Sequence, residues 1–456
     1  MGCKTAEPPP STAEPVVVVE SQPIKDGPVL LRENISLRKV AEIGGGGIKL
    51  AINPQNGNFY YLRPGEGVFQ LILGDSPTTK KVVELQEITV EGFLTGMKFG
   101  PDGTLYVVVN RRPNESETLT QAAIYKGTID DSGGSSWQNL MTTEPYPASN
   151  TNFDHLFNGI TVSPDNKWVF VSSGSRTDHG EVEDTEGSFP DVREVDMTTR
   201  IFRIPADASG LMIPNDEEAQ KELGLLFAKG TRNAYDLEFG PNGDLFGIDN
   251  GPDADYSEEL NWLREGHHYG FPWRFGNQDN PQQLADYDPS QDKRLSNDFA
   301  AVQNETYQND PGFPSPPQEF TDPIVNLGPD AAQYRDDGGN AQNAAARGET
   351  VSTFTPHRSP LGLVFFDNDQ LPSTLQSPAE SLGLFVVSWG AAGGDLSDQG
   401  NDLLHLSLTK KENNYEAVTN QIARGFRRPI DAVMIENRLY VLEWDGAGVI
   451  WELTFE

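Results

Sequence analysis

Cysteine is almost missing from this sequence, which has a single one, Cys3, in 456 residues. One thiol can form neither an internal disulfide nor a cysteine-based zinc cluster. Long apolar runs are missing too, and no stretch approaches the roughly 18 consecutive apolar residues that would predict a membrane-spanning helix. Positive charge is scarce, because 34 Lys and Arg stand against 68 Asp and Glu, for a formal net charge of −34. Such an acidic surface repels phosphate backbones and disfavours nucleic acid as a partner.

Several catalytic signatures are also lacking. The chain has no G-x-G-x-x-G strand–helix unit, which disfavours a nicotinamide cofactor. It has no G-x-S-x-G nucleophile elbow and no H-E-x-x-H zinc helix. Helical periodicity is sparse, and its clearest instance is NDEEAQKELGLLFA, residues 215–228. The sequence therefore predicts a mainly β structure.

One strand–turn–strand pattern recurs along the chain. Alternating apolar residues lead into a turn of Pro, Asp, Asn and Gly, and a second apolar strand follows. Asp-Gly and Asn-Gly between such runs are the strongest local hairpin signals, because these residues accept the positive φ angles of tight turns. The six copies begin at Ile48, Leu94, Phe157, Ala234, Pro360 and Pro429.

A third strand candidate follows several of these hairpins, as in AAIYKG, RIFRIP, DLLHLSL and GVIWELT. Three or four strands in succession make one blade of a β-propeller, and neighbouring blades bury each other's faces. The copies begin about 45 to more than 100 residues apart, so the later ones carry insertions. We therefore expect residues 31–456 to form an all-β, six-bladed β-propeller with long inserted loops. Residues 275–349, rich in Asn, Gln, Asp and Pro, form a long loop insertion that we expect at one mouth of the ring.

The N-terminus, MGCKTAEPPP, resembles the start of a mature bacterial lipoprotein, in which a cysteine after a small residue carries the lipid. The resemblance implies lipidation at Cys3 and a flexible tether over residues 1–30, rich in Pro, Glu and Val. It also implies an exported protein, periplasmic or on the cell surface, that meets the membrane only through its anchor. The alternative is an unmodified cysteine in a flexible tail.

Residues 230–273 carry five short motifs in a fixed order. Together they resemble the glucose/sorbosone dehydrogenase family, which has a G-x-R-N opening, a P-D/N-G turn, an N/Q-G-P loop, an E-x-N element and a Y-G-W-P close. The matching residues are Arg232-Asn233, Pro241-Asn242-Gly243, Asn250-Gly251-Pro252, Glu259-Leu260-Asn261 and Tyr269-Gly270-Phe271-Pro272.

The resemblance implies pyrroloquinoline quinone (PQQ), a flat ortho-quinone with three carboxylates, and Ca²⁺ as cofactors. It makes the backbone carbonyls of Gly251 and Pro252 candidate metal ligands, and Arg232 and Asn233 candidate cofactor contacts. The chemistry agrees, because Ca²⁺ prefers oxygen ligands and an arginine presents a planar fork of donors to a polyanion. The alternative is a surface turn with a solvated arginine.

His155 stands directly before the third hairpin, in Phe153-Asp154-His155. The resemblance implies that it is the general base that takes a proton from the sugar hydroxyl, a role that suits imidazole. The alternative is a histidine that caps the blade. Many relatives have an arginine three residues later, where this chain has Asn158.

Two further segments resemble the family. Pro356-His357-Arg358-Ser359-Pro360 matches H-S-A-P, and Arg428-Pro429-Ile430-Asp431 matches G-R-P-V-D, which makes His357 and Arg428 candidate cofactor contacts. One segment departs from the pattern. Ser388-Trp389-Gly390 matches G-S-W-N-R at its start, but small residues and Asp395 follow instead of a basic residue. Arg176, Arg358 or Arg427 could supply the missing charge.

The expected function is PQQ-dependent oxidation of an aldose or related polyol, with hydride transfer to the quinone, a small-molecule sugar as substrate and a separate electron acceptor. One alternative is a metal-dependent lactonase with Asp249, Asp253 and Glu259 around a buried cation. Another is a surface propeller without a cofactor that binds carbohydrate or protein. The enzyme hypothesis requires His155, Arg232 and Gly251-Pro252 to meet at one mouth of the ring.

Overall fold

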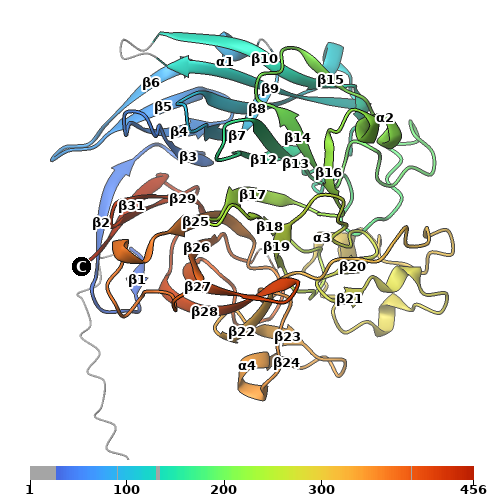
Figure 1. The fold of residues 1–456 in the computed structure, drawn as a ribbon. Helices are drawn as coiled ribbons and strands as arrows, with labels where there is room; N and C mark the ends of the chain where they lie inside the picture. The colour runs from blue at the N-terminus through green and yellow to red at the C-terminus, as the bar shows by residue number, and fades with distance from the viewer. Residues whose placement is uncertain (1–26, 90, 130–133, 392) are drawn as a thin grey trace, which may run out of the picture.

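The computed structural model describes residues 27–89, 91–129, 134–391 and 393–456. In these residues the strands form six consecutive sheets arranged around a ring (Figure 1), which confirms the predicted six-bladed β-propeller. Cys3 and most of the predicted tether lie outside the described residues. Within them, no helix has the length and apolar character needed to cross a membrane.

The main strands of the first three blades follow the chain order, each from the inner strand outward. The second blade gains two short strands at its edge, one of which, β15, pairs in parallel with β10. Their strands are β3 (Lys49–Ile52), β4 (Phe59–Arg63), β5 (Gly67–Ile72) and β6 (Thr78–Glu84); β7 (Phe93–Phe99), β8 (Leu105–Arg111), β9 (Leu119–Ile129), β10 (Ser135–Thr143), β11 (Tyr146–Pro147) and β15 (Leu211–Ile213); β12 (Phe157–Val162), β13 (Trp168–Ser173), β14 (Arg200–Pro205) and β16 (Leu226–Lys229).

The remaining blades are less regular. The fourth has three strands, and the fifth carries β1 and β22 against its outer strand. Their strands are β17 (Ala234–Phe239), β18 (Leu245–Asp249) and β19 (Glu259–Leu263); β25 (Pro360–Phe366), β26 (Leu382–Ser388), β27 (Asp402–Lys411), β28 (Asn414–Arg424), β1 (Val29–Leu30) and β22 (Val325–Pro329); β29 (Pro429–Ile435), β30 (Arg438–Glu443), β31 (Val449–Phe455) and β2 (Ile35–Glu42).

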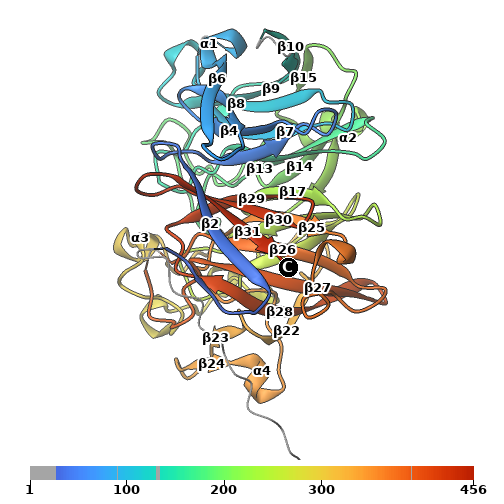
Figure 2. The ribbon, with the colours of Figure 1, turned by 90° about the vertical axis from the view of Figure 1, so that its left-hand side faces the viewer.

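The ring closes by pairing the two ends of the described chain. Strand β2, from the N-terminal side, adds antiparallel to β31, with Ile35 opposite Phe455. The sixth blade thus takes three strands from the C-terminus and one from the N-terminus. This pairing fastens the last blade to the start of the chain, and Figure 2 shows β2 running along the outside of the ring beside β31.

Six hydrophobic clusters lie between neighbouring blades, one for each junction of the ring. Alternate residues of one strand point to opposite faces of its sheet. Leu105 accordingly packs against the first blade, and the next residue, Tyr106, packs against the third. In the fourth blade Leu245 faces the third and Phe246 faces the fifth. Both faces of each sheet are therefore buried, as the alternating pattern in the sequence predicts.

The α-helices of the described residues are few and short: α1 (Leu85–Ile88), α2 (Glu217–Glu222), α3 (Ala300–Gln303) and α4 (Ala344–Arg347). Single 3-10 turns lie at Pro113–Glu115, Pro281–Gln283, Pro289–Gln291 and Asn368–Gln370. The predicted helix over 215–228 is only partly correct, because α2 is followed by Gly224 at φ 69°. That left-handed residue ends the helix, and β16 then pairs with β14 in the third blade.

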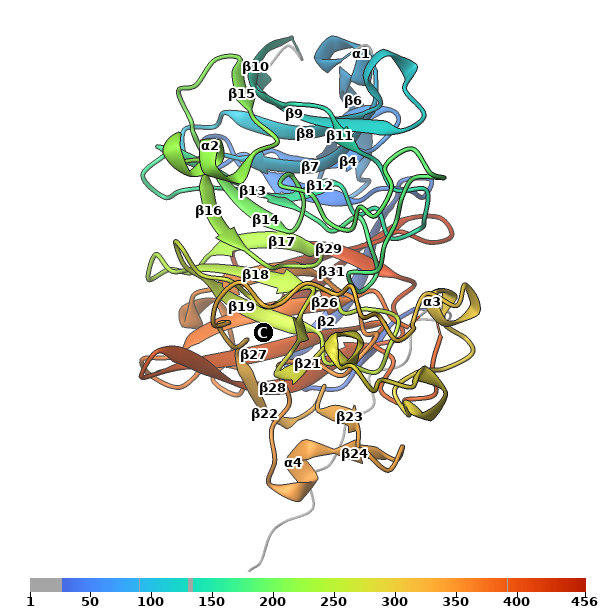
Figure 3. The same ribbon diagram turned by 90° about the vertical axis from the view of Figure 1, so that its right-hand side faces the viewer.

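The insertion over 275–349 does two different things. Its first part carries α3 and lies at one mouth of the ring (Figure 3). Its second part adds β22 in parallel to β28, with Val325 opposite Glu416, and so covers the outer edge of the fifth blade instead. Two small hairpins belong to this region, made of β20 (Arg274–Phe275) with β21 (Gln278–Asp279) and β23 (Gln333–Arg335) with β24 (Ala341–Asn343).

Candidate active site

The register of the inner hairpins decides which loops meet at the same mouth of the ring. Ala234, the first residue of β17, lies opposite Asp249, the last of β18. The residues before β17 and after β18 are therefore neighbours. Phe157 opposite Ser173 repeats this relationship in the third blade. Loops that precede a first strand or follow a second strand thus converge at one mouth.

A cavity of about 360 Å³ opens at this mouth, and we call it the mouth cavity. Its volume lies in the range of roughly 300–1,000 Å³ that is usual for small-molecule sites. Its walls come from the third, fourth and fifth blades and from the insertion. The lining residues are Asn152, Phe153, His155, Arg232, Asn250, Gly251, Pro252, Asp253, Glu258, Asp298, Phe299, Ala300, His357, Ser359 and Gly393.

Five of the residues that the sequence singled out therefore lie around one space: His155, Arg232, Gly251, Pro252 and His357. They come from four loops that are far apart in the sequence. Asn233 and Arg428, the other two predicted contacts, do not line the mouth cavity.

The surroundings of His155 fix its tautomer. Its Nδ1 lies 3.1 Å from Oγ of Ser175 and 3.3 Å from the carbonyl oxygen of the same residue. That hydroxyl already donates to the carbonyl of Thr177 at 2.7 Å, so it can only accept from the histidine. The proton of the neutral ring therefore sits on Nδ1. The other ring nitrogen, Nε2, is left unprotonated and can act as a base.

The charge state of His155 agrees with this tautomer. Burial, followed by the positive charge of Arg232, lowers the pKa of His155 to about 3. Hydrogen bonds involving the backbones of Ser175 and Phe153 favour the protonated form but are outweighed. The imidazole is thus neutral near pH 7.

Arg232 is held rigidly by a buried carboxylate. Its Nε donates to the carbonyl of Asp178 at 2.7 Å, and its Nη2 donates to Oδ1 of the same residue at 2.8 Å. Asp178 is fully buried and also bonds Nδ1 of His179 at 2.8 Å. Burial opposes ionisation of Asp178, but the bond from His179 and the charge of Arg232 prevail and lower its pKa to about 2. Arg232 therefore meets the mouth cavity as one half of an ion pair.

Asn233 lies behind the cavity wall in a chain of three amides. Asn158 donates from Nδ2 to Oδ1 of Asn233 at 2.7 Å, and Asn233 donates from Nδ2 to Oδ1 of Asn250 at 3.1 Å. Only Asn250 reaches the mouth cavity. Asn158, where many relatives have arginine, here anchors this amide chain. Asn233 is thus placed to position Asn250.

Oxygen atoms gather on the wall formed by Gly251 and Pro252. The Pro252 carbonyl accepts a hydrogen bond from the amide of Ala254 at 2.7 Å, whereas the Gly251 carbonyl accepts none from any residue that the structure describes. Glu258 lies beside Gly251 and is 2% exposed, and burial raises its pKa to about 8. Burial and then the charge of Asp178 raise the pKa of Asp253 on the same wall. Carbonyl and carboxylate oxygens are the ligands that Ca²⁺ prefers.

The carboxylates of the lactonase hypothesis are not arranged as a metal site. Asp249 accepts hydrogen bonds from the backbone amides of Arg232 and Asn233, at 2.8 and 2.5 Å. Glu259 accepts from Gly276 and Asn261. Across the described part of the chain, no three His, Cys, Asp or Glu side chains are placed to share an ion. Asp249 and Glu259 instead serve to hold loops.

His357 is fixed by a second buried network. Its Nε2 lies 2.9 Å from Oδ1 of Asp255, and its ring packs on Phe299 with the ring centres 4.3 Å apart. Arg335 bonds Asp255 and Asp395 at once. Because Phe299 and Arg335 belong to the insertion, the insertion holds His357 in place.

The small residues and the aspartate that follow Trp389, where the chain departs from the family pattern, lie against the insertion. A side chain at Gly393 would lie 3.3 Å from Asp298, and one at Gly394 would lie 3.1 Å from the ring of Phe299. The small residues let the insertion approach the fifth blade, and Asp395 pairs with Arg335 instead of facing the cavity. The insertion thus packs closely against Gly393 and Gly394.

The remaining arginines do not supply that charge to the mouth cavity. Arg428 donates from Nη1 to the carbonyls of Gly390 and Ala391 at 2.8 and 3.1 Å. Arg358 is buried and pairs with Asp398 and Asp402, and Arg176 is buried and pairs with Glu183. Arg427 is exposed. None of these four guanidinium groups lines the mouth cavity.

A family model described as Glucose / Sorbosone dehydrogenase matches residues 66–296, just over half of the chain. The chain belongs to the glucose/sorbosone dehydrogenase family. Membership makes it an oxidoreductase that acts on a sugar CH–OH group. The matched region contains His155, Arg232, Asn233, Gly251 and Pro252, whereas His357 and Arg428 lie beyond it.

Solved structures share the fold at low sequence identity. The soluble aldose sugar dehydrogenase of Escherichia coli, in its apo-form, is 13% identical over 92% of this chain and 100% of that one, with a TM-score of 0.57. The PQQ domain of pyranose dehydrogenase from Coprinopsis cinerea, in its holo form, is 13% identical over 95% and 98%, with a TM-score of 0.58. The PQQ-bound aldose sugar dehydrogenase of Streptomyces coelicolor is 14% identical over 93% and 99%, with a TM-score of 0.52. No curated protein sequence matches the chain.

Some residues of the site could not be found from the sequence. Asp178, Ser175 and Phe299 stand in no repeat and no recognisable motif, yet they hold Arg232, His155 and His357 in place. No local periodicity marks a residue whose role is to contact another blade. Such residues are recognised only from the contacts they make in the folded ring.

Proposed function

We propose that this glucose/sorbosone dehydrogenase family member oxidises an aldose or related polyol with PQQ as its cofactor and Ca²⁺ as its metal. The observation that carries the proposal is the convergence of His155, Arg232, Gly251, Pro252 and His357 on one cavity. Two structurally similar dehydrogenases, from Coprinopsis cinerea and Streptomyces coelicolor, are described in holo and PQQ-bound form, which supports the choice of cofactor.

When bound, PQQ supplies an ortho-quinone that accepts hydride, and Ca²⁺ supplies a Lewis acid that polarises the reactive carbonyl. The residues of the mouth cavity suit such guests. Phe153 and Phe299 present apolar rings, and Arg232 presents guanidinium donors. The Gly251 carbonyl, which accepts no hydrogen bond from the described residues, can bind a cation. Gly251 and Pro252 would hold the metal, while Arg232 and Asn250 would contact the quinone and a carboxylate. Asn233 would act through Asn250, and His357 would border the ring.

Charge compensation makes the metal essential in this proposal. The mouth cavity carries Asp253, Glu258 and Asp298, and Arg232, the arginine among its described lining residues, is already paired with Asp178. A tricarboxylate entering this space needs further positive charge, because an uncompensated buried charge is very costly. Ca²⁺ on the Gly251 wall provides it. Glu258 contributes less repulsion, since its raised pKa keeps much of it protonated at neutral pH.

His155 performs the proton transfer. Its Nε2 carries a lone pair, because Ser175 holds the ring proton on Nδ1. A sugar whose C1 hydroxyl meets Nε2 gives up its proton there as C1 is oxidised. The positive charge of Arg232 lowers the pKa of His155. An anionic guest in the cavity offsets that charge and so raises the pKa again. The guest therefore makes His155 a stronger base when it is bound.

Reconstitution tests this function. Purified protein is incubated with PQQ and Ca²⁺, freed of unbound cofactor, and assayed with aldoses and an artificial electron acceptor. We expect a bound chromophore whose spectrum changes on sugar addition, together with steady turnover. Retention of no quinone, or a quinone unaffected by every aldose tested, would contradict the proposal.

A second candidate is a cofactor-less propeller that binds carbohydrate. The ion pair between Arg232 and Asp178 favours it, because that arginine is not held open for a cofactor. Calorimetry of the apo-protein with sugars separates the two functions. Sugar binding without quinone binding or turnover would establish the second.

We also propose that the protein is exported and carries a lipid at Cys3, since its first residues resemble a mature lipoprotein. Metabolic labelling with palmitate in a bacterial host should label the wild type and spare Cys3→Ser. A label on both, or on neither, would contradict the anchor.

A further inference from the structure

A second cavity opens at the same mouth, between the second and third blades. Its volume is about 440 Å³. Phe93 begins β7 opposite Asn110 near the end of β8, so this cavity faces the same side of the ring as the mouth cavity. We call it the Arg111–Arg112 cavity, and it is lined by Gly92, Phe93, Asn110, Arg111, Arg112, Thr120, Ser149, Thr151, Asp154 and Leu156.

The two arginines of this cavity differ from those around the mouth cavity. Arg111 donates from Nε and Nη2 to the amide oxygen of Gln121, at 3.0 and 2.7 Å. Arg112 donates from Nη1 to the backbone carbonyl of Glu117 at 2.5 Å. Neither forms a salt bridge with a carboxylate of the described residues, although the charge of Arg112 acts on Asp154, which lines the same cavity. Arg232, by contrast, is neutralised by a carboxylate in contact with it.

Donors therefore remain on both guanidinium groups. Nη1 of Arg111 and Nη2 of Arg112 have no hydrogen-bond partner among the residues that the structure describes. In a chain with a net charge of −34, the two adjacent arginines outnumber Asp154, the carboxylate among the lining residues, and so form a local positive site. Guanidinium groups bind carboxylates and other oxyanions through paired hydrogen bonds. The cavity thus has the chemistry to recognise an anion.

Its apolar wall adds a preference for a flat ligand. Phe93 is 40% exposed, which leaves part of an aromatic ring open beside the two arginines. Leu156 contributes a further apolar surface. A planar anion can place its ring against Phe93 and its charge against the guanidinium groups.

The position of this cavity relates it to the candidate active site. Asp154 and Leu156 line the Arg111–Arg112 cavity, whereas His155 between them lines the mouth cavity. The backbone of residues 154–156 is therefore a shared wall. The backbone amide of Ser149, which also lines the Arg111–Arg112 cavity, donates to Oδ2 of Asp154 at 3.0 Å and fixes this wall in place.

We propose that the Arg111–Arg112 cavity binds a planar, anionic quinone or quinone-imine that serves as the electron acceptor. The binding site stands on its own geometry, and its role as acceptor site rests on the proposed function. Oxidation of an aldose at C1 breaks one C–H and one O–H bond and releases two electrons and two protons. A quinone-imine takes up the two electrons and the two protons when its C=N and C=O groups are reduced to N–H and O–H. Electrons and protons thus balance between sugar and acceptor.

Direct binding tests the site without turnover. The probe is oxidised 2,6-dichlorophenolindophenol, a planar quinone-imine that is anionic at neutral pH, measured by equilibrium dialysis with the purified protein. We expect binding to weaken about tenfold in Arg112→Gln and further in Arg111→Gln/Arg112→Gln, since each charged hydrogen bond contributes about a factor of ten. Arg32→Gln removes the same charge at an exposed residue outside both cavities and should bind as the wild type does.

The outcomes separate cleanly. Equal binding by the wild type and the double variant, or no binding by the wild type, would overturn the site. Because Arg111 contacts Gln121, the melting temperature of each variant is measured, and Arg112→Gln alone decides the matter if the double variant is unfolded. In the reconstituted enzyme, we expect a raised KM for the anionic dye with unchanged KM for the sugar. Dye binding without any sugar oxidation would remove the proposed function but leave the site.

Discussion

Lys49 of the first blade and Asp236 of the fourth form an ion pair across the centre of the ring, with Nζ and Oδ1 3.3 Å apart. Both lie on inner strands that line an axial cavity of about 220 Å³. Lys98 of the second blade reaches Glu238 of the fourth in the same way. Ion pairs across the axial cavity thus connect blades that are not neighbours in the ring.

Lys49→Met should destabilise the protein strongly. Burial opposes the charge on Lys49, but the carboxylates of Asp236 and Asp431 prevail and raise its pKa. Removing the lysine takes away the cation in contact with Asp236, and Lys98, the other nearby cation, pairs with Glu238. We expect a loss of about 3–5 kcal/mol. The measurement is the unfolding midpoint in urea.

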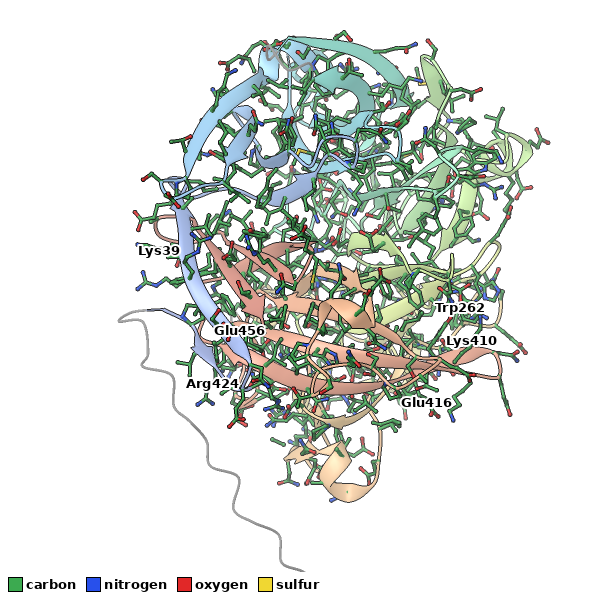
Figure 4. All side chains as sticks on the ribbon, turned by 60° about the vertical axis from the view of Figure 1, so that its left-hand side comes forward. Lys39, Trp262, Lys410, Glu416, Arg424 and Glu456 are labelled. Atoms are coloured by element: carbon green, nitrogen blue, oxygen red, sulfur yellow. The ribbon has the colours of Figure 1, made fainter. Side chains whose placement is uncertain are left out.

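The matched control for Lys49→Met is Lys39→Met. Lys39 lies at the outer edge of the ring on β2 (Figure 4), and it and its partner Glu42 are both about half exposed. We expect a cost of at most about 1 kcal/mol there. Similar costs at the two positions would show that the axial ion pair has no special role.

His155→Ala should abolish sugar oxidation while the protein still binds PQQ. The substitution removes the proposed base but leaves Arg232 and the Gly251 wall intact. Loss of a general base lowers kcat/KM by about 10²–10⁴-fold. Steady-state kinetics and quinone absorbance on the same sample provide the two readouts. His267→Ala, outside the mouth cavity, should be active, and unchanged activity in His155→Ala would remove His155 from its role.

The blades could be predicted from the sequence because their signals are local. In the second blade, Asp102 and Gly103 form the predicted turn, with Gly103 at φ 84° and its amide bonded to the Gly100 carbonyl. Alternating apolar residues on either side then fix the register. The same local logic identified the fourth hairpin around Asn242 and Gly243.

Other features depend on contacts between distant segments, and no local pattern encodes them. The strand β22 reaches the fifth blade from within the insertion, and its register with β28 is set only in the folded ring. Phe299 likewise meets His357 through the chain's overall path. For the site, the fold brings His155, Arg232 and Gly251 to the mouth cavity, whereas Asn233 and Arg428 do not line it. Sequence spacing could not distinguish these two groups, because it does not tell which side chain faces inward.

Calcium should stabilise the protein more at high pH than at low pH. Burial raises the pKa of Glu258 from an ordinary value of roughly 4.3 to about 8. Its protonated form favours the folded state, so this contribution to stability is present below about pH 4 and is lost as the pH rises through 8. A cation beside Gly251 reverses the loss, because it favours the ionised carboxylate.

Melting temperatures with Ca²⁺ and with a chelator, at pH 5.5 and pH 8.5, check this expectation. The stabilisation by Ca²⁺ should be larger at pH 8.5, and Glu258→Gln should reduce that difference. Glu305→Gln, which alters an exposed carboxylate, serves as the control. Equal stabilisation by Ca²⁺ at both pH values would show that the ionisation of Glu258 does not contribute to metal binding.

Asp298→Asn should shift the enzyme toward anionic sugars. Asp298 is exposed and lines the mouth cavity, where the half-buried Asp253 adds a further acidic group. A uronate approaching this cavity is repelled, while a 2-amino sugar is attracted. We expect kcat/KM for the uronate to rise several-fold in the variant and that for the amino sugar to fall, with glucose little changed.

Salt should weaken both shifts, since exposed charges are screened over about 8–10 Å. Asp75→Asn removes the same charge from an exposed turn of the first blade and should change none of the three rates, so matching shifts there would assign the selectivity to net charge instead of to Asp298.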